Sequence, residues 1–152
     1  MEPHIHNFRS ISFSLSETLM GVNILDIREI VPAAKITKVP GSPEFVMGLI
    51  NLRGQILTIL DIAVLLGLAE TKINPASHII VFKYKDAGFA VDAIGDVIET
   101  RPDSIESVPA SMDYGIRDYL SGITELEKGV LMILDAEKLL AACILDAGMS
   151  GG

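Results

Sequence analysis

An internal repeat narrows the range of folds open to this chain more than any other pattern in its sequence. Residues 21–31 match residues 88–98 at an offset of 67, and residues 56–61 match residues 130–135 at an offset of 74. Two copies of about 65 residues are each too small to bury much apolar surface alone. We therefore expect two similar lobes packed as one unit, with a groove for a ligand or a partner at the seam between them.

Most segments within each copy predict β-strands. Residues 8–15 alternate between apolar residues and serines, a period of two that is typical of a half-buried strand. Further strands are expected at residues 19–24, at 48–60 with a turn at 53–55, at 79–84, at 89–94 and at 130–134. Short helices are expected after Asp61, ending at Gly67, and over residues 135–145. Asp caps helix N-termini, and Gly adopts the left-handed conformation that ends a helix.

These elements predict a mainly β protein with short helices. We expect a single domain over residues 8–141, made of lobes at about 15–67 and 82–140. Residues 1–7 and 146–152 are expected to be flexible tails.

Composition and charge exclude several classes of protein. Hydrophobic residues make up 49% of the chain, which excludes intrinsic disorder. The net charge of −8 disfavours a surface that binds nucleic acid or anionic lipid. The longest nearly apolar stretch, residues 56–69, contains Asp61 and is too short to span a membrane. With no signal-peptide pattern and only Cys143 as a thiol, we expect a cytoplasmic protein without disulfides.

The turn around Arg53 is the clearest candidate for a functional loop. Asn51, Arg53 and Gly54 lie between two apolar strand segments, and the second copy has different residues there, Glu125-Leu126-Glu127-Lys128. Loops on a repeated scaffold often carry function, but a plain surface turn would also need a glycine like Gly54. An ion pair between Glu29 and Arg53 would hold the turn in place, and an ordinary solvated pair is the alternative.

The sequence gives no positive support for catalysis or for a bound metal. His4 and His6 could begin a metal site, but no further ligand completes it. Asp61 and Asp135 could form a pair of acid–base carboxylates, although equivalent positions before each helix favour capping. Cys143 lies on the apolar face of the last helix and is expected in the core. We expect no cofactor.

Residues 46–56, which contain Gly48, Asn51, Arg53 and Gly54, resemble the signature of the CheW family of bacterial chemotaxis adaptors. The resemblance extends over residues 8–140. It implies a fold of two intertwined, five-stranded SH3-like barrels and a non-enzymatic protein. Such an adaptor couples transmembrane chemoreceptors to the histidine kinase CheA by binding the kinase's regulatory domain and the receptor's cytoplasmic tip.

The resemblance also assigns residues to surfaces. It places Glu29, Ile30, Thr37 and Lys38 on the kinase-facing surface. It places Ile27, Ile79, Ile94 and Val97 in the groove that takes the receptor helix. Gly48, Asn51, Arg53 and Gly54 would form a hinge between the two surfaces.

The sequence leaves two other functions open. The chain could be an adaptor for another chemosensory-type kinase pathway, or a β-barrel module that binds a small ligand at the seam. For the leading interpretation we expect a cytoplasmic scaffold that is recruited to membrane receptor arrays through its partners, without inserting into the membrane itself.

Overall fold

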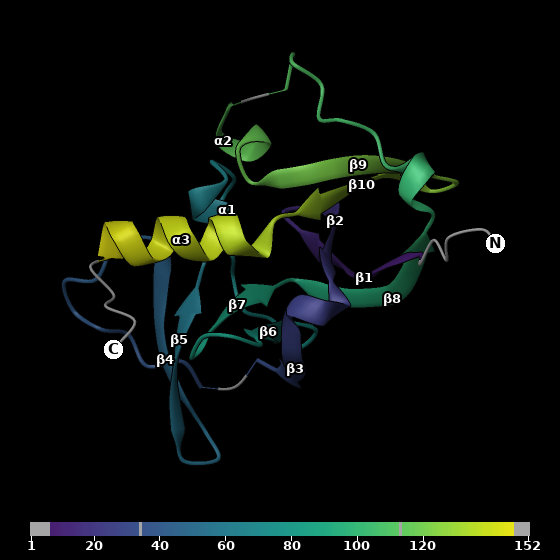
Figure 1. Ribbon diagram of the computed structural model, residues 1–152. Helices are drawn as coiled ribbons and strands as arrows, with labels where there is room; N and C mark the ends of the chain where they lie inside the picture. The colour runs from purple at the N-terminus through teal and green to yellow at the C-terminus, as the bar shows by residue number, and fades with distance from the viewer. Residues whose placement is uncertain (1–6, 34, 113, 148–152) are drawn as a thin grey trace.

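The computed structural model describes residues 7–33, 35–112 and 114–147, and these residues form two five-stranded sheets with short helices (Figure 1). Sheet A has the order β8-β1-β2-β10-β9, with β1 (Phe8–Leu15), β2 (Thr18–Asn23), β8 (Ala93–Thr100), β9 (Leu120–Leu126) and β10 (Gly129–Leu134). Sheet B has the order β3-β6-β7-β5-β4, with β3 (Ile27–Pro32), β4 (Val46–Leu52), β5 (Gln55–Leu60), β6 (His78–Phe82) and β7 (Ala87–Val91). The α-helices are α1 (Ile62–Leu65), α2 (Tyr114–Arg117) and α3 (Ala136–Ala147), and the 3-10 turns are η1 (Ile24–Asp26) and η2 (Pro102–Ser104). The predicted mainly β class is confirmed.

The two sheets do not coincide with two consecutive segments of the chain. The β1–β2 hairpin pairs with β8 and β10, whereas the β6–β7 hairpin pairs with β3 and β5. Each sheet therefore combines the first hairpin of one copy with the last three strands of the other. The lobe boundaries expected at residues 15–67 and 82–140 do not match the sheets, because β2 and β7 each lie in the sheet built mainly from the other copy.

The repeat offsets reappear in the register of the two parallel strand pairs. Ile133 of β10 pairs with Gly21 of β2, and Ile59 of β5 pairs with Gly88 of β7. Ile133 follows Ile59 by 74 residues and Gly88 follows Gly21 by 67, so the two pairs are equivalent positions of the repeat. The repeat in the sequence is thus a repeat of strand pairing.

One apolar core joins the sheets. The ring of Phe89 in sheet B lies 5.5 Å from that of Phe13 in sheet A and 5.3 Å from that of Phe82, measured between ring centroids. All three side chains are buried, and Leu139 and Cys143 of α3 pack into the same cluster. The expected core position of Cys143 is confirmed, and the shared core explains why neither sheet needs to be stable alone.

Sheet B also curves around a second, smaller core. Ala33 donates a backbone hydrogen bond to Ser77, which extends the pairing of β3 with β6, and Thr37 already pairs with Leu49 of β4. Four residues span at most about 14 Å, so the two edges of sheet B must come close together. We call this closed sheet barrel B. Its interior side chains are Ile50, Leu57, Ile59, Ile79, Val81 and Ala90.

Sheet A closes in the same way. The chain leaves β8 after Thr100, and Glu106 forms a two-way bridge with Ile123 of β9. We call this closed sheet barrel A. The β4–β5 hairpin of barrel B and the β9–β10 hairpin of barrel A project in different directions, toward the bottom and the right of the view in Figure 1.

Three features of the fold differ from expectation. The strand at residues 8–15 is not half-buried: Ser10 and Ser12 are fully buried, because neighbours on both edges and closure of the barrel cover that face as well. The segment expected as one strand at 89–94 is divided between β7 and β8. Strands β3 and β9 were not predicted, since both are edge strands with charged or exposed residues that interrupt the apolar pattern.

The helix predictions are confirmed. Asp61 precedes α1 and its carboxylate accepts from the Ala63 amide at 3.2 Å, and Gly67 has a φ of 77°. The Asp135 carboxylate accepts from the Lys138 amide at 3.1 Å. No helix among the described residues is long and apolar enough to cross a membrane. Of the expected tails, residues 1–6 and 148–152 lie outside the described residues, whereas residues 146 and 147 belong to α3.

Candidate partner-binding surfaces

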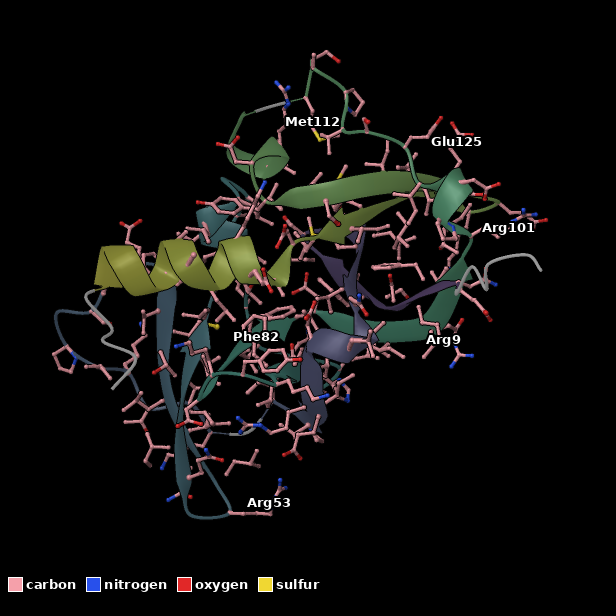
Figure 2. The ribbon with its side chains drawn as sticks, in the orientation of Figure 1. Arg9, Arg53, Phe82, Arg101, Met112 and Glu125 are labelled. Carbon is pink, nitrogen blue, oxygen red and sulfur yellow. The ribbon has the colours of Figure 1, made fainter. Side chains whose placement is uncertain are left out.

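The β4–β5 hairpin ends in a two-residue turn at Arg53 and Gly54. Their φ angles are 51° and 87°, the positive values of the turn type that joins tightly twisted strands. The Asn51 side-chain oxygen accepts from the Gly54 amide at 2.8 Å. The predicted turn is confirmed, and it carries Arg53 at the outermost point of barrel B (Figure 2).

Arg53 forms an ion pair with Glu29 of β3. The Arg53 side chain is 68% exposed and that of Glu29 is 27% exposed. A pair exposed to this degree contributes between 0 and about 1 kcal/mol to stability. Its main effect is therefore geometric: it holds the hairpin tip against the opposite edge of the sheet and fixes where the guanidinium lies.

A second polar group of side chains surrounds the same end of barrel B. Arg28 donates to the Gln55 side chain at 3.2 Å and to the Lys85 carbonyl at 3.3 Å. Gln55 donates to the Asp86 carboxylate at 2.5 Å, and Arg28 lies 3.5 Å from that carboxylate. Sequence reasoning missed this group, because its members come from three segments that only the closed barrel brings together.

Gly48 and Thr37 fix the segment that precedes this hairpin. Thr37 and Leu49 exchange two backbone hydrogen bonds, of 2.9 and 2.8 Å. Gly48 has a φ of 148°, and a Cβ built on it would lie 2.2 Å from the Thr37 carbonyl oxygen. Only a glycine fits where β4 passes the Thr37 backbone. Gly48, which was expected at a hinge, is therefore needed for packing.

The four residues expected to face a kinase lie on two parts of barrel B. Glu29 and Ile30 are half-buried on β3 at one edge of the sheet. Thr37 and Lys38 are exposed and lie beside β4 at the other edge. The ion pair between Glu29 and Arg53 connects these two edges through side chains.

Ile27 and Ile94 occupy equivalent positions at the seam. Ile27 pairs with Phe82 and Ile94 pairs with Phe13, and both of these rings adjoin Phe89. Both isoleucines are partly buried against the core shared by the two sheets. Val97 lies three residues beyond Ile94 on the edge strand β8 and is 55% exposed.

Ile79 lies elsewhere. It points into barrel B and is 0% exposed, packed with the interior cluster. The expectation that it lines an open groove is wrong, because β6 is an interior strand with β3 and β7 on either side. Of the residues expected to face a receptor, Ile27 and Ile94 are partly buried and Val97 is exposed.

Asp61 and Asp135 do not form a pair of acid–base carboxylates. Asp61 is 4% exposed and accepts hydrogen bonds from the Thr71 amide and hydroxyl, both at 2.9 Å, besides its capping bond. Asp135 caps α3 at the other sheet. Each carboxylate is engaged in holding local backbone.

Asp26 is a charged residue that sequence reasoning passed over. It lies in η1, where the chain crosses from sheet A to sheet B. Burial is the largest cause that raises its pKa, and the carboxylates of Glu137 and Asp135 raise it further, while Lys83 lowers it. This acidic side chain thus meets the start of α3 across the junction of the sheets.

No metal site is evident in the part of the chain that the structure describes. No group of three or more His, Cys, Asp or Glu residues there is placed to hold an ion. The His78 ring lies 2.8 Å from the Ala76 carbonyl. His4 and His6 lie outside the described residues.

Comparison with known proteins identifies the relatives of this chain. A family model described as a CheW-like domain matches residues 9–143. The chain is 31% identical over 134 residues to a probable chemotaxis protein CheW of Rhizobium etli, with 86% of each chain covered. It is 30% identical over 134 residues to the chemotaxis protein CheW of Bacillus subtilis, covering 87% of this chain and 86% of the relative.

A solved structure agrees with these sequence relatives. The crystal structure of the scaffolding protein TtCheW from Thermoanaerobacter tengcongensis superposes with a TM-score of 0.78 at 32% sequence identity. The superposition covers 90% of this chain and 89% of that protein. The likeness therefore includes both barrels and their exchanged hairpins.

Proposed function

This chain belongs to the CheW family of chemotaxis scaffolding proteins, and we propose that it couples transmembrane chemoreceptors to the histidine kinase CheA. The observation that carries the proposal is the family match over residues 9–143, which includes both barrels. The function is positional and non-catalytic. We place the protein in the cytoplasm, recruited to receptor arrays through its two partners.

The proposed kinase-facing surface is the end of barrel B that carries Glu29, Ile30, Thr37 and Lys38. Glu29 is held by Arg53, and a preorganised charged group loses less freedom when a partner binds. Exposed charges beside a half-buried isoleucine have the character of an interface with an apolar centre and a polar rim. The regulatory domain of CheA is the proposed partner.

The proposed receptor-facing surface is the seam at Ile27, Ile94 and Val97. Ile27 and Ile94 flank the row of rings formed by Phe82, Phe89 and Phe13, so the seam has an apolar floor. Amphipathic helices bind to such surfaces through apolar side chains spaced along one face. The cytoplasmic tip of a chemoreceptor is the proposed occupant.

Co-sedimentation with CheA and receptor-bearing membranes from the same organism tests the proposal, with kinase activity measured in the pellet. We expect the wild-type protein to sediment with both partners and to change kinase activity. Val97→Asp should weaken receptor sedimentation while the fold survives, because Val97 is exposed. Val130→Asp is the matched control, since Val130 is also an exposed valine of sheet A, 43% exposed, but lies on the β10 hairpin.

Two outcomes would count against specific parts of the proposal. Equal sedimentation of Val97→Asp and Val130→Asp would remove Val97 from the receptor surface. Failure of the wild-type protein to bind CheA or receptors would favour an adaptor for another chemosensory-type kinase pathway.

A further inference from the structure

Strand β3 carries a β-bulge at Arg28. Ile27 pairs with Phe82 and Glu29 pairs with Val81, so Arg28 is an extra residue between two consecutive positions of β6. Side chains of neighbouring residues on a regular strand point to opposite faces of the sheet, and a bulge re-aims one of them. The bulge explains why two consecutive residues, Arg28 and Glu29, both contact the β4–β5 hairpin.

Arg28 ties this hairpin to a second loop of barrel B. Its Nη1 atom donates to the Gln55 side chain at 3.2 Å, directly after the hairpin turn. Its Nη2 atom donates to the Lys85 carbonyl at 3.3 Å and lies 3.5 Å from the Asp86 carboxylate, in the turn between β6 and β7. The Arg28 side chain is 29% exposed, compared with 68% for Arg53. Arg28 is therefore the more enclosed of the two arginines at this end of the barrel.

Barrel A carries different residues at the positions that hold this hairpin. The β9–β10 hairpin pairs its ends with the same spacing as the β4–β5 hairpin, at the repeat offset of 74 residues. The residues of barrel A at the positions of Arg28, Glu29, Arg53 and Gln55 are, in that order, Gly95, Asp96, Glu127 and Gly129. Two glycines and two carboxylates cannot form these side-chain contacts with one another. Because barrel A closes with these residues, the contacts of Arg28 are not a requirement of the barrel fold.

We propose that Arg28 is a positioning residue for the kinase-facing surface. Glu29 holds the turn through Arg53, and Arg28 adds a second tie through Gln55, so that Arg53 is presented in one place. A guanidinium has a planar fork of donors that bonds to two segments at once, whereas an ammonium is a compact point charge. A hairpin that is ordered before binding loses less freedom on association. The effect on kinase binding rests on the coupling function proposed above, and the effect on the hairpin does not.

Nitrogen-15 relaxation of the backbone amides of Arg53 and Gly54 tests the positioning in the free protein. We expect Arg28→Ala and Arg28→Lys to lower the order parameters of these amides at least about 1.4-fold, the ratio between a rigid and a flexible backbone. Arg101→Ala is the matched control, because it removes the same charge from an exposed arginine that pairs with Asp103 after β8. Unchanged order parameters in Arg28→Ala would overturn the proposal.

Calorimetric titration with CheA separates positioning from direct contact. Arg28→Ala should weaken binding at least about fivefold in the wild-type protein but less than about twofold in an Arg53→Ala background, because the group that Arg28 positions is then already missing. Arg28→Lys should bind as weakly as Arg28→Ala, since the ammonium cannot replace the fork. Equal losses in both backgrounds, or rescue by lysine, would show that Arg28 contacts the kinase itself and would overturn the positioning role.

Failure of the coupling function gives a different result. A wild-type protein that does not bind CheA would contradict the function proposed above, and the relaxation measurements on Arg28→Ala and Arg101→Ala would then decide alone whether Arg28 fixes the hairpin.

Discussion

Arg53, at the tip of the β4–β5 hairpin, forms an ion pair with Glu29 on the edge strand β3, so one pair of side chains ties together the two edges of barrel B. The two residues are 24 positions apart in the sequence. The pair lies at the end of the barrel that we propose faces the kinase. Substitutions at this pair can therefore separate an effect on the stability of the protein from an effect on kinase binding.

Reversing Arg53 should impair binding far more than folding. We expect Arg53→Glu to change the free energy of unfolding by less than about 1 kcal/mol, since the Arg53 side chain is 68% exposed. CheA binding should weaken at least about tenfold, because the interface then presents two like charges. Calorimetric titration gives the affinity and thermal unfolding gives the stability.

The charge-swapped double variant Arg53→Glu with Glu29→Arg is the control for this prediction. It restores the pair inside the protein but reverses the charges shown to a partner. If the swap restores CheA binding, Arg53 acts by holding the hairpin in place; if binding stays weak, Arg53 or Glu29 contacts the kinase directly. An unchanged affinity in Arg53→Glu alone would remove Arg53 from the surface.

Gly48→Ala should be strongly destabilising. The new Cβ would lie 2.2 Å from the Thr37 carbonyl oxygen at a φ of 148°, so both the backbone and the Thr37 bridge would have to shift. We expect a loss of about 3 kcal/mol or more in denaturant unfolding. Gly41→Ala is the matched control, because Gly41 also has a positive φ, of 79°, but has nothing within 4 Å of the added carbon. Similar losses in both variants would show that the Thr37 contact is unimportant.

The two capping aspartates should respond differently to the same substitution. Asp61→Asn should cost about 1–3 kcal/mol, because an amide replaces one of the oxygens that accept from Thr71 in a buried site. Asp135→Asn should change stability by only a few tenths of a kcal/mol, since Asn caps helices about as well as Asp. Urea unfolding of both variants measures the difference, and equal losses would contradict the special role of Thr71.

Asp26 should make the protein less stable as pH rises. Its pKa in the folded state is raised above its ordinary value of 3.8, so the unfolded chain releases the proton first. The folded state then binds more protons, and stability falls as pH rises from 3.8 through the raised pKa. Asp26→Asn should therefore be more stable than the wild type at pH 7, with the difference vanishing below about pH 3.

Unfolding midpoints measured at several pH values test the Asp26 prediction. Glu137→Gln, which removes a carboxylate that raises this pKa, should give a smaller gain of the same sign. A gain in Asp26→Asn that is constant with pH would point to packing rather than charge.

Much of the fold could be predicted because short-range patterns carry it. Apolar segments with turn residues predicted β1, β2, β4, β5, β6 and β10, and Asp61 and Asp135 predicted where α1 and α3 start, whereas α2 was not predicted. The edge strands β3 and β9, and most of β8, escaped prediction because charged or exposed residues interrupt their apolar pattern. Of the candidate site, the turn at Arg53 and Gly54 was predicted and the pairing with Glu29 was one of two alternatives, whereas the Arg28–Gln55–Asp86 group was not predicted.

Two copies of one β-rich unit could be recognised without the structure, because the offsets of 67 and 74 residues are read directly from the sequence. The sequence also determined the turn at Arg53-Gly54 and the caps, since these depend on residues a few positions apart. The exchange of the first hairpins, the interior position of Ile79, and the burial of Ser10 and Thr100 without hydrogen-bond partners among the described residues became visible in the folded chain alone. The physical reason is that hydrogen bonds between strands far apart in the chain decide which faces of each strand become enclosed. The alternation of side chains along a strand is the same whether one face or both faces are covered, so the sequence of the strand does not show the difference.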